Sequence, residues 1–279
     1  MFDTVAGFES IRETRLFPKR LFEERLKALG VWNERFSYAL MPAKNDQRVQ
    51  AIGKLLDSKT ELFSKTGERL YKGKIAGVKV LVLNSGIGGP STALTIETLL
   101  HVGVRSFIRV GSAGAIQPNL KTGDVVIPTG AVRGEGTSAE YVAAGYPAFA
   151  DPGLHTSLAK ACEQLGKRLG LKWYAGITWT HDAFFAENVE KLREMRQANV
   201  LAVEMEVAAL FILASLRGVR AAAILAITDN MVEGRARRSV YTDPGRRKRY
   251  LMGSNAIAQI AVDAVKLDQR SYRLLKSSR

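Results

Sequence analysis

Two glutamates, Glu204 and Glu206, interrupt an apolar run that extends from Ala202 to Phe211. Such a run is expected to be buried, and an isolated carboxylate in an apolar interior is costly unless it is paired or hydrogen-bonded. One interpretation places both acids at a strand-to-helix junction, where they cap the helix and reach solvent. The other is a carboxylate clamp for a polyhydroxylated ligand such as a ribose, with Met205 packed against the sugar ring. The residues that the fold brings to this junction decide between the two.

Arginines supply the opposite charge at two places. Arg109 lies inside a β-branched and aromatic run, 106–110, which predicts a buried strand. Open parallel sheets bind ligands at the carboxyl ends of their strands, and arginine suits bidentate binding of phosphate. We therefore expect Arg109 to bind an anion. Arg48 falls in the first turn of a helix predicted from about Gln47 to Leu56, where a cation is unfavourable to the helix dipole, so it either serves an anion or is solvated.

A glycine-rich segment, 85–92 (SGIGGPST), links a predicted strand over Val78 to Leu83 with a predicted helix over Ala93 to Val102. Glycines let the backbone approach a ligand closely. Pro90 suits the first turn of a helix, because N–H groups there have no acceptor within the helix and proline has no N–H to leave unpaired. The segment is a candidate anion cradle at a helix N-terminus. It has neither the Gly-Lys-Ser/Thr of a P-loop nor the spacing of a dinucleotide fingerprint, so neither ATP nor NAD is indicated.

Composition narrows the class of protein. The 279 residues carry a formal net charge of +14 and are 46% hydrophobic, which is enough for a sizeable core and favours anionic partners: nucleic acid, a membrane surface or a phosphate-bearing substrate. The single cysteine, Cys162, excludes an internal disulfide, fits a reducing compartment and is expected in the core. The first residues lack the apolar region of a signal peptide, and the longest apolar runs are too short to cross a bilayer. We expect a cytoplasmic protein without membrane contact.

Strands and helices are predicted to alternate along the chain. The predicted strands are 38–42, 78–83, 106–110, 123–129, 173–178 and 221–227, and the later predicted helices are 154–166, 189–197, 207–216 and 251–267. This order predicts an α/β fold: one domain with a central, mostly parallel or mixed twisted sheet flanked by helices on both faces. We expect residues 1–37 to form an N-terminal helical extension, 38–270 the α/β domain, and 271–279 a C-terminal tail.

A basic stretch surrounds Asp243, Pro244 and Gly245. Its cations are Arg235, Arg237, Arg238, Arg246, Arg247, Lys248 and Arg249. The turn-forming residues predict an exposed loop here. Three interpretations stay open: a solvated surface, a lid over an anionic ligand, or a patch for nucleic acid. No Cys/His cluster has metal-ligand spacing, so no metal site is expected.

In combination, the segments 85–92, 107–117, 123–126, 182–185 and 203–206 resemble the nucleoside phosphorylase-I family. The likeness is to uridine phosphorylases and their archaeal purine-cleaving relatives, and it runs in order from about Tyr38 to Asn230. It implies a pentosyltransferase in which inorganic phosphate, as co-substrate and without a cofactor, attacks C1′ of a nucleoside. The products are the free base and (deoxy)ribose 1-phosphate. Such a reaction requires the protein to position an anion, hold the sugar and stabilise the leaving base.

The resemblance also implies roles for individual residues. Phosphate would be bound by Arg48, Arg109, Ser112, the loop at Gly86, and Arg69 reaching in from a neighbouring subunit. The ribose would be bound by Glu204, Met205 and Glu206. The base would be bound by Phe184, through stacking, and by Asn188, Gly114 and Asp229. Arg109 and Asp229 would be the catalytic residues.

The sequence departs from the family pattern at several of these positions. Ala43-Lys44 stands where the phosphate loop usually has a glycine, and no histidine precedes His101, although uridine phosphorylases contribute one across a subunit interface. Asn188 and Glu190 replace the glutamine and arginine that read uracil. Asp229 ends a strand where purine-cleaving relatives carry a proton donor to the leaving base, or it is a turn or helix-capping aspartate. The base therefore stays open between uracil and a purine.

Two other functions are compatible with these residues. A hydrolytic nucleosidase would share the fold and use water instead of phosphate. A non-catalytic protein that binds anions or nucleic acid would use the basic stretch and show steeply salt-dependent binding. We expect the phosphorylase, with a nucleoside and phosphate as its small-molecule partners and without a nucleic-acid partner. The resemblance also implies a homo-oligomer, a dimer at minimum and often a hexamer.

Overall fold

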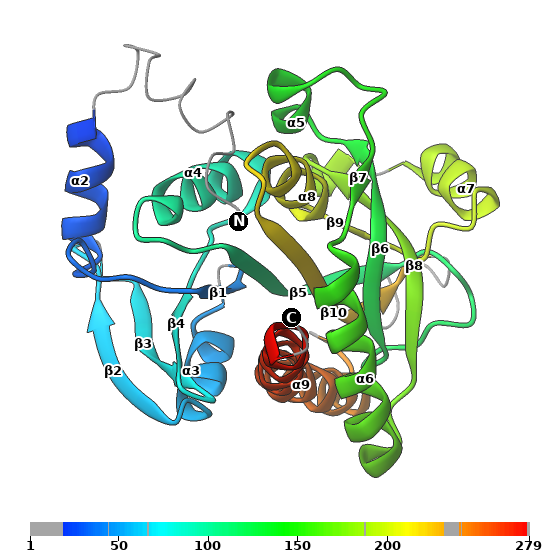
Figure 1. Ribbon diagram of the computed structural model, residues 1–279. Coiled ribbons are helices and arrows are strands. Elements are labelled where there is room, and N and C mark those ends of the chain that lie inside the picture. The colour runs from blue at the N-terminus through cyan, green and yellow to red at the C-terminus, as the bar shows by residue number, and fades with distance from the viewer. Residues whose placement is uncertain are drawn as a thin grey trace.

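The computed structural model describes residues 19–43, 45–65, 67–186, 188–231, 240 and 242–277 (Figure 1). Its strands are β1 (Tyr38–Pro42), β2 (Ser58–Phe63), β3 (Arg69–Ile75), β4 (Val78–Leu83), β5 (Ser106–Ala115), β6 (Val125–Gly134), β7 (Ala148–Phe149), β8 (Trp173–His181), β9 (Ala202–Glu204) and β10 (Arg220–Asn230). Its helices are α2 (Lys19–Ala28), α3 (Asp46–Lys54), α4 (Gly88–Leu100), α5 (Thr137–Tyr141), α6 (Pro152–Leu169), α7 (Val189–Gln197), α8 (Val207–Leu216) and α9 (Pro244–Ser277), with a 3-10 turn, η1, at Phe184–Ala186. The predicted α/β class with one mixed central sheet is confirmed.

One sheet of ten strands joins these elements, in the order β10-β6-β8-β9-β5-β1-β4-β3-β2 with β7 beside β6. β10 also pairs with β5, so β5, β10, β6, β8 and β9 close into a ring. The pairs β1–β4, β1–β5, β5–β10, β6–β8 and β8–β9 are parallel, and the rest are antiparallel. The carboxyl ends of β1, β5 and β10 therefore meet at one edge.

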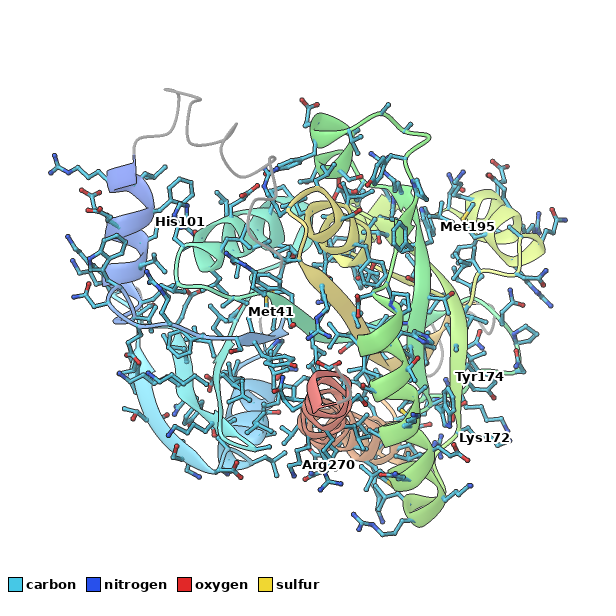
Figure 2. The ribbon with its side chains drawn as sticks, viewed as in Figure 1. Met41, His101, Lys172, Tyr174, Met195 and Arg270 are labelled. Carbon is cyan, nitrogen blue, oxygen red and sulfur yellow. The ribbon has the colours of Figure 1, made fainter. Side chains whose placement is uncertain are left out.

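Helices cover both faces of the sheet (Figure 1). On one face, Phe107 of β5 belongs to an apolar cluster that includes Leu99 of α4 and Phe211 of α8. On the other, Ile108 packs in a cluster with residues of α3, α6 and α9, among them Ile260. Figure 2 shows Met41 of β1 in the middle of the molecule and Lys172 and Arg270 at its periphery. Successive side chains of β5, such as Phe107 and Ile108, point to opposite faces of the sheet. The face on which a site residue lies therefore decides which helices it can contact.

Local sequence accounts for several element boundaries. Asp151 caps α6 by accepting from the N–H of Leu154 at 2.8 Å, and Pro152 occupies the first turn. The same helix ends at Gly170, whose φ of +65° is the left-handed conformation that favours glycine. α8 is apolar on every side because it lies in the interior, where Val207 through Ala214 are all buried.

The elements differ from the sequence-based prediction at several places, and α5 and β7 were not predicted at all. β2 and β3 form an unpredicted antiparallel hairpin beside β4. β5, β6 and β10 run beyond the predicted strand ends, so Gly111 to Ala115 pair with their neighbours instead of forming a loop. The exposed loop predicted around Pro244 is wrong for residues 244–249, which form the start of α9. That helix continues through Ser277, into the segment expected to be a tail.

The N-terminal part of the described chain packs on the core. Leu26 of α2 is fully buried, and the Arg25 guanidinium donates to the hydroxyl of Thr98 on α4 at 3.2 Å. Predictions that fall on residues 1–18, Lys44, Arg235, Arg237 and Arg238 lie outside the described residues. Within the described ranges, no helix has the length and apolarity needed to cross a membrane. Cys162 is buried, as predicted.

Candidate active site

Glu204 and Glu206 lie where β9 meets α8, and both are buried, with 5% and 3% of their surface exposed. The Glu204 carboxylate accepts hydrogen bonds from the N–H groups of Glu206, at 2.8 Å, and Val207, at 3.0 Å. It also accepts from the hydroxyl of Thr180 at 2.6 Å. Glu204 therefore caps α8, as the junction interpretation predicted, but the predicted contact with solvent is wrong.

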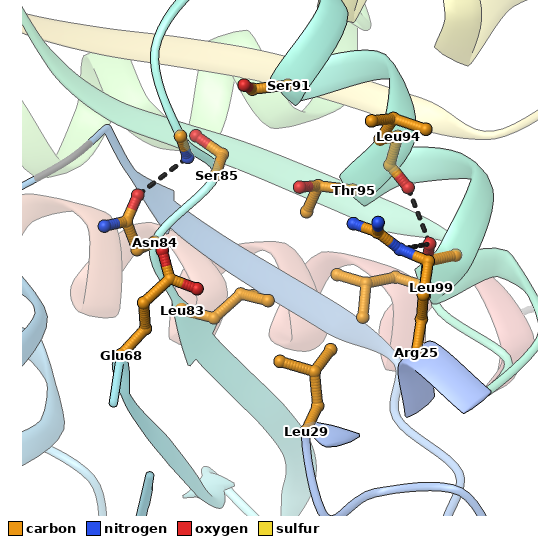
Figure 3. A pocket seen from close by; sticks show the side chains of 12 residues that line it. Arg25, Leu29, Glu68, Leu83, Asn84, Ser85, Ser91, Leu94, Thr95 and Leu99 are labelled. Carbon is orange, nitrogen blue, oxygen red and sulfur yellow. Dashed lines mark hydrogen bonds between the residues drawn. The ribbon is translucent and has the colours of Figure 1, made fainter. Parts of the chain in front are cut away.

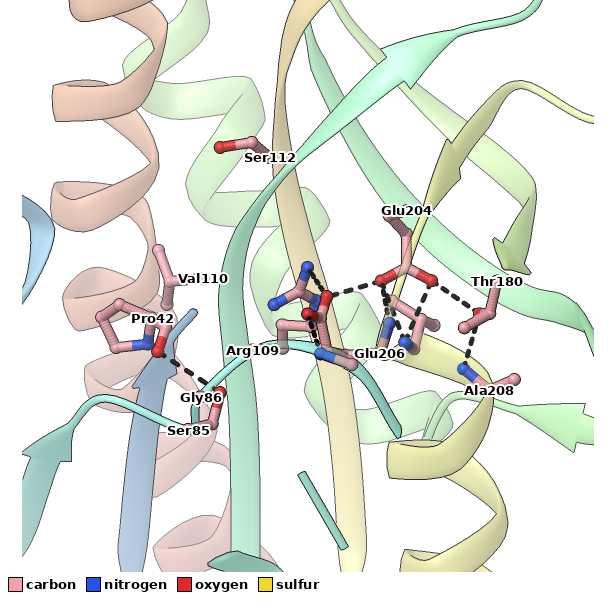
Figure 4. A network of polar contacts seen from close by, with 12 residues as sticks. Pro42, Ser85, Gly86, Arg109, Val110, Ser112, Thr180, Glu204, Glu206 and Ala208 are labelled. Atoms are coloured by element: carbon pink, nitrogen blue, oxygen red, sulfur yellow. Dashed lines mark hydrogen bonds and ion pairs between the residues drawn. The ribbon is translucent and has the colours of Figure 1, made fainter. Parts of the chain in front are cut away.

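Arg109 joins the two carboxylates (Figure 4). Its Nε donates to Glu204 at 3.2 Å, and its Nη2 forms an ion pair with Glu206. The side chain reaches them by lying along β5 over Gly111, where a Cβ atom would come within 2.7 Å of the guanidinium carbon. Because such a contact is closer than real Cβ atoms make, Gly111 is needed for this conformation. The structure thus brings Arg109, Glu204 and Glu206 together on one face of the sheet.

Burial and charge act against each other in this cluster. Burial is the largest influence and raises the pKa of Glu204; the charge of Arg109 lowers that pKa, and the charge of Glu206 raises it. The N–H groups at the start of α8 stabilise the Glu204 carboxylate in addition to Arg109, because a helix N-terminus carries partial positive charge. Every oxygen of Glu204 therefore has a donor, which is the condition for keeping a carboxylate inside a core.

Arg48 lies on the opposite face of β5, in the first turn of α3, and is buried with 3% exposed. It donates to the backbone oxygen of Val110 at 3.2 Å and to three hydroxyls: Ser112 at 3.0 Å, Tyr250 at 3.1 Å and Ser254 at 3.0 Å. The interpretation of Arg48 as a solvated arginine is therefore wrong. Among the described residues it forms no ion pair, so its positive charge has no carboxylate beside it.

The two arginines converge on residues 110–112 of β5. Burial lowers the pKa of Arg48, the Tyr250 hydroxyl opposes this, and the positive charge of Arg109 lowers the pKa further. Each has one buried nitrogen without a hydrogen-bond partner among the described residues: Nε of Arg48 and Nη1 of Arg109. Buried donors are normally satisfied, so each of these two nitrogens is suited to an anion.

The glycine-rich segment meets the cluster through Gly88, whose N–H donates to Glu206 at 2.8 Å. This N–H belongs to the first turn of α4, so the predicted anion cradle holds the protein's own carboxylate. Gly86 has a φ of +79°, and its N–H donates to the side chain of Asn84 at 2.7 Å. A Cβ on Gly86 would come within 2.5 Å of Ser91, so only glycine allows this turn. Its predicted role in phosphate binding stays a prediction.

A cavity of about 170 Å³ lies under the same segment, between α2 and α4 (Figure 3). Arg25 and Glu68 line it together with Asn84, Ser85 and Thr95. The extension that precedes the α/β domain thus comes within reach of the glycine-rich segment.

Arg69 begins β3 and has partners of its own. It forms ion pairs with Asp46, at 3.0 Å, and with Glu61, and its guanidinium lies 5.0 Å from the ring centre of Phe63. These partners lie outside the groups around Arg48 and Arg109, so the structure does not bring Arg69 into the site of its own chain. Its predicted contribution to a neighbouring subunit stays a prediction.

The four residues predicted around the base lie on three neighbouring segments. Phe184 is half-exposed in η1, with its ring edge-on to Phe185 at 5.1 Å. Asn188 caps α7 by accepting from the N–H of Lys191 at 2.7 Å. A Cβ on Gly114 would lie 3.0 Å from the sulfur of Met231, and Asp229 accepts from the N–H of Val240 at 3.1 Å. This contact joins two segments eleven residues apart and is not a helix cap, so both the capping or turn interpretation and a role toward the base stay predictions.

Sequence reasoning missed Thr180, Gly111, Tyr250 and Ser254. Tyr250 and Ser254 are four residues apart, which places them on one helical face, but the helix was predicted to begin after Tyr250. Gly111 had a signal, since a glycine two residues after a buried strand arginine leaves room for that side chain. Among the described residues, no group of three or more His, Cys, Asp or Glu side chains is placed to hold a metal ion.

Proteins similar to this chain include uridine and guanosine phosphorylases. The model of the phosphorylase superfamily matches residues 38–258. A uridine phosphorylase of Thermococcus kodakarensis is 38% identical over 239 residues, 80% of this chain and 82% of its own, and a guanosine phosphorylase of Halorubrum lacusprofundi is 37% identical over 188 residues, 67% and 76% of the two chains. The crystal structure of a uridine phosphorylase from Vibrio fischeri ES114 superposes with a TM-score of 0.73 at 28% identity, covering 84% of this chain and 92% of that one. The chain belongs to the phosphorylase superfamily.

Proposed function

We propose that this protein, a nucleoside phosphorylase, binds inorganic phosphate between Arg48, Arg109 and Ser112 and transfers it to C1′ of a nucleoside. The observation that carries the proposal is the pair of buried arginines at residues 110–112, each with one unpartnered guanidinium nitrogen. The relatives of this chain that are named uridine phosphorylase and guanosine phosphorylase support phosphate as the co-substrate. No further cofactor is proposed.

In the proposed reaction, a phosphate oxygen forms a bond to C1′ while the bond from C1′ to the base nitrogen breaks. The electron pair of that bond leaves with the base, which takes up a proton. Arg48 and Arg109 hold the phosphate dianion in a site with little solvent, where its orientation toward C1′ requires no reorganisation. Positive charge that develops on the sugar is then balanced by the bound phosphate.

The carboxylates have distinct proposed roles. Glu206 accepts hydrogen bonds from the ribose hydroxyls, Met205 packs on the sugar, and Glu204 fixes Arg109 and the start of α8. The contacts support this division: Glu204 accepts from Arg109, Thr180 and two backbone N–H groups, whereas each Glu206 oxygen has one partner among the described residues, the Gly88 N–H on one and Arg109 on the other. A ribose hydroxyl would therefore find acceptor capacity on Glu206 first.

The base is proposed to stack on Phe184, with Asn188, Gly114 and Asp229 around it, and to be uracil or a purine. Asp229 tests the purine alternative, as the proton donor to the leaving base. Asp229→Asn is then expected to slow base release from inosine and adenosine by about a hundredfold. Wild-type rates for both nucleosides in this variant would remove Asp229 from the mechanism.

We also propose a homo-oligomer, a dimer or a trimer of dimers, in which Arg69 of one subunit completes the site of another. Cytoplasmic location is proposed because the single cysteine fits a reducing compartment. Sedimentation of the purified protein tests the oligomer.

The experiment that tests the proposed function measures free-base release from uridine, guanosine, inosine, adenosine and 5′-methylthioadenosine, with and without phosphate. The expected result is release that saturates with phosphate and yields a sugar 1-phosphate. Release of free ribose at the same rate without phosphate would instead identify a hydrolase. Absence of base release together with tight, salt-sensitive binding of polynucleotide would identify the non-catalytic alternative.

A further inference from the structure

The partners of Arg48 differ in kind from those of three other buried or half-buried arginines. Arg109, Arg217 and Arg220 each form an ion pair with a carboxylate. Arg48 is buried more completely than most side chains of its type, yet its described partners are one backbone oxygen and three hydroxyls. Arg133 is also held by neutral oxygens, but it is only half-buried, and each of its three side-chain nitrogens has a partner. Hydroxyls satisfy a guanidinium's donors and leave its charge uncompensated.

Two of these hydroxyls come from α9. The Tyr250 hydroxyl lies 3.1 Å from Nη2 of Arg48 and 3.0 Å from the hydroxyl of Ser112, and the Ser254 hydroxyl lies 3.0 Å from the same nitrogen. Both residues are half-buried. Their spacing of four places them on one face of α9, and that face packs against α3 and β5.

We infer that Tyr250 and Ser254 are positioning residues of the phosphate subsite, holding Arg48 and Ser112 in place through neutral hydroxyls so that the charge of Arg48 is kept for the anion. The inference rests on the proposed function, since it concerns the same subsite. Three hydroxyl oxygens restrain the same nitrogen of the Arg48 guanidinium, which leaves the group few orientations. The direction of its unpartnered Nε–H is therefore fixed as well. A carboxylate at either α9 position would satisfy the same donors and would compete with phosphate for the charge.

The test compares steady-state constants for phosphate and for nucleoside in four variants of the full chain. Tyr250→Phe and Ser254→Ala each remove one hydroxyl and are expected to raise KM for phosphate about tenfold, with KM for the nucleoside changed less than about twofold. Ser254→Thr keeps a hydroxyl and is expected to restore phosphate KM. Ser254→Asp adds the carboxylate and is expected to raise phosphate KM about a hundredfold or more.

Matched controls come from the same chain. Ser271→Ala removes an exposed serine hydroxyl further along α9, and Tyr174→Phe removes a tyrosine hydroxyl on β8. Both are expected to leave the two KM values unchanged. In an Arg48→Met background, Tyr250→Phe is expected to have no further effect on phosphate KM, because a positioning residue acts only through the group it positions.

Failure of the inference is distinguishable from failure of the proposed function. If the wild type requires phosphate but Tyr250→Phe, Ser254→Ala and their double variant all keep phosphate KM within about twofold of it, the inference is wrong and the proposed function stands. Equal rises in phosphate and nucleoside KM would also overturn the inference, because they indicate a general loss of structure. Phosphate-independent base release by the wild type overturns the proposed function itself.

Discussion

Helix α9 carries the partners of two arginines, one near each end, and these partners differ in charge. Near its start, the neutral hydroxyl oxygens of Tyr250 and Ser254 accept hydrogen bonds from Arg48. Fourteen residues later, roughly 20 Å along the helix, Asp268 binds Arg220 through both carboxylate oxygens, at 3.0 and 2.8 Å. Among the described residues, the charge of Arg48 has no carboxylate to compensate it, whereas Asp268 compensates the charge of Arg220.

The surroundings of Arg220 complete this contrast. Tyr38 is buried and hydrogen-bonds to Asp268 at 2.5 Å, and Ser106 accepts from Arg220 at 2.7 Å. Here tyrosine, carboxylate and arginine satisfy one another, as expected of a cluster that ties α9 to the sheet. The comparison teaches that burial of an arginine does not by itself indicate a site. The charge left over after its protein partners are counted is the better indicator.

The largest expected effect comes from Arg109, which serves both purposes. Arg109→Met removes a proposed phosphate ligand and leaves Glu204 and Glu206 buried without their cation. We expect kcat/KM for phosphate to fall at least about a thousandfold and the free energy of unfolding to fall by about 3–5 kcal/mol. Steady-state kinetics and urea denaturation measure the two losses. Arg168→Met on the exposed side of α6 is the matched control, and a loss of activity with full stability would show that Arg109 is not needed to neutralise the acids.

Arg48→Met sharpens the comparison, because activity and stability are expected to separate. Without Arg48, kcat/KM for phosphate should fall about a hundredfold. The free energy of unfolding should stay the same or rise by up to about 1 kcal/mol, since an uncompensated buried charge is replaced by an apolar side chain. Chemical denaturation of the purified variant checks this. A destabilisation as large as that of Arg109→Met would mean that Arg48 is a structural arginine.

Asp268→Asn tests the neutralised end. Removal of the carboxylate charge beside Arg220 should lower the free energy of unfolding by about 3 kcal/mol, because Arg220 is left partly buried without its anion. The KM for phosphate should stay within about twofold of the wild-type value. Asp263→Asn, at a half-buried position of the same helix, is the control. A changed phosphate KM in Asp268→Asn alone would mean that the two ends of α9 are not independent.

The smallest expected effect is a pH dependence at Tyr38. Burial, together with the hydrogen bond to Asp268, raises the pKa of Tyr38 from 10.0 to about 12. The folded protein therefore keeps this proton between pH 10 and about 12 while the unfolded chain loses it, so stability falls as the pH rises through that window. The wild type should lose about 2 kcal/mol more than Tyr38→Phe over this range, measured by denaturation at each pH. Parallel curves for the two proteins would contradict the assignment.

Much of this fold could be predicted from local pattern. β4 and α7 have the predicted bounds, because a run of β-branched and other apolar residues with a single lysine, and a charged stretch behind a capping asparagine, are strong local signals. β2 could not be predicted in this way, since five of its six residues are exposed and it exists only through pairing with β3. The closure of β5 with β10 and β6 is likewise a property of the whole sheet.

The candidate site also contains some residues that the sequence predicted and others that only the structure shows. The family resemblance predicted that Arg109, Glu204 and Glu206 belong to one site, but it did not predict their direct ion pairs, since Arg109 was expected to bind phosphate and the glutamates a ribose. Tyr250 and Ser254 were not predicted, since a proline and a glycine at 244–245 predicted a loop where α9 begins. Pro244 instead occupies the first position of the helix, where its missing N–H costs nothing.

The most direct test of the central claim is equilibrium binding of inorganic phosphate, without nucleoside, by isothermal titration calorimetry of the wild type, Arg48→Met and Arg220→Met. We expect the wild type and Arg220→Met to bind phosphate alike, and Arg48→Met to bind at least about a hundredfold more weakly. Equal phosphate affinity in all three proteins would contradict the claim that the uncompensated arginine holds the anion.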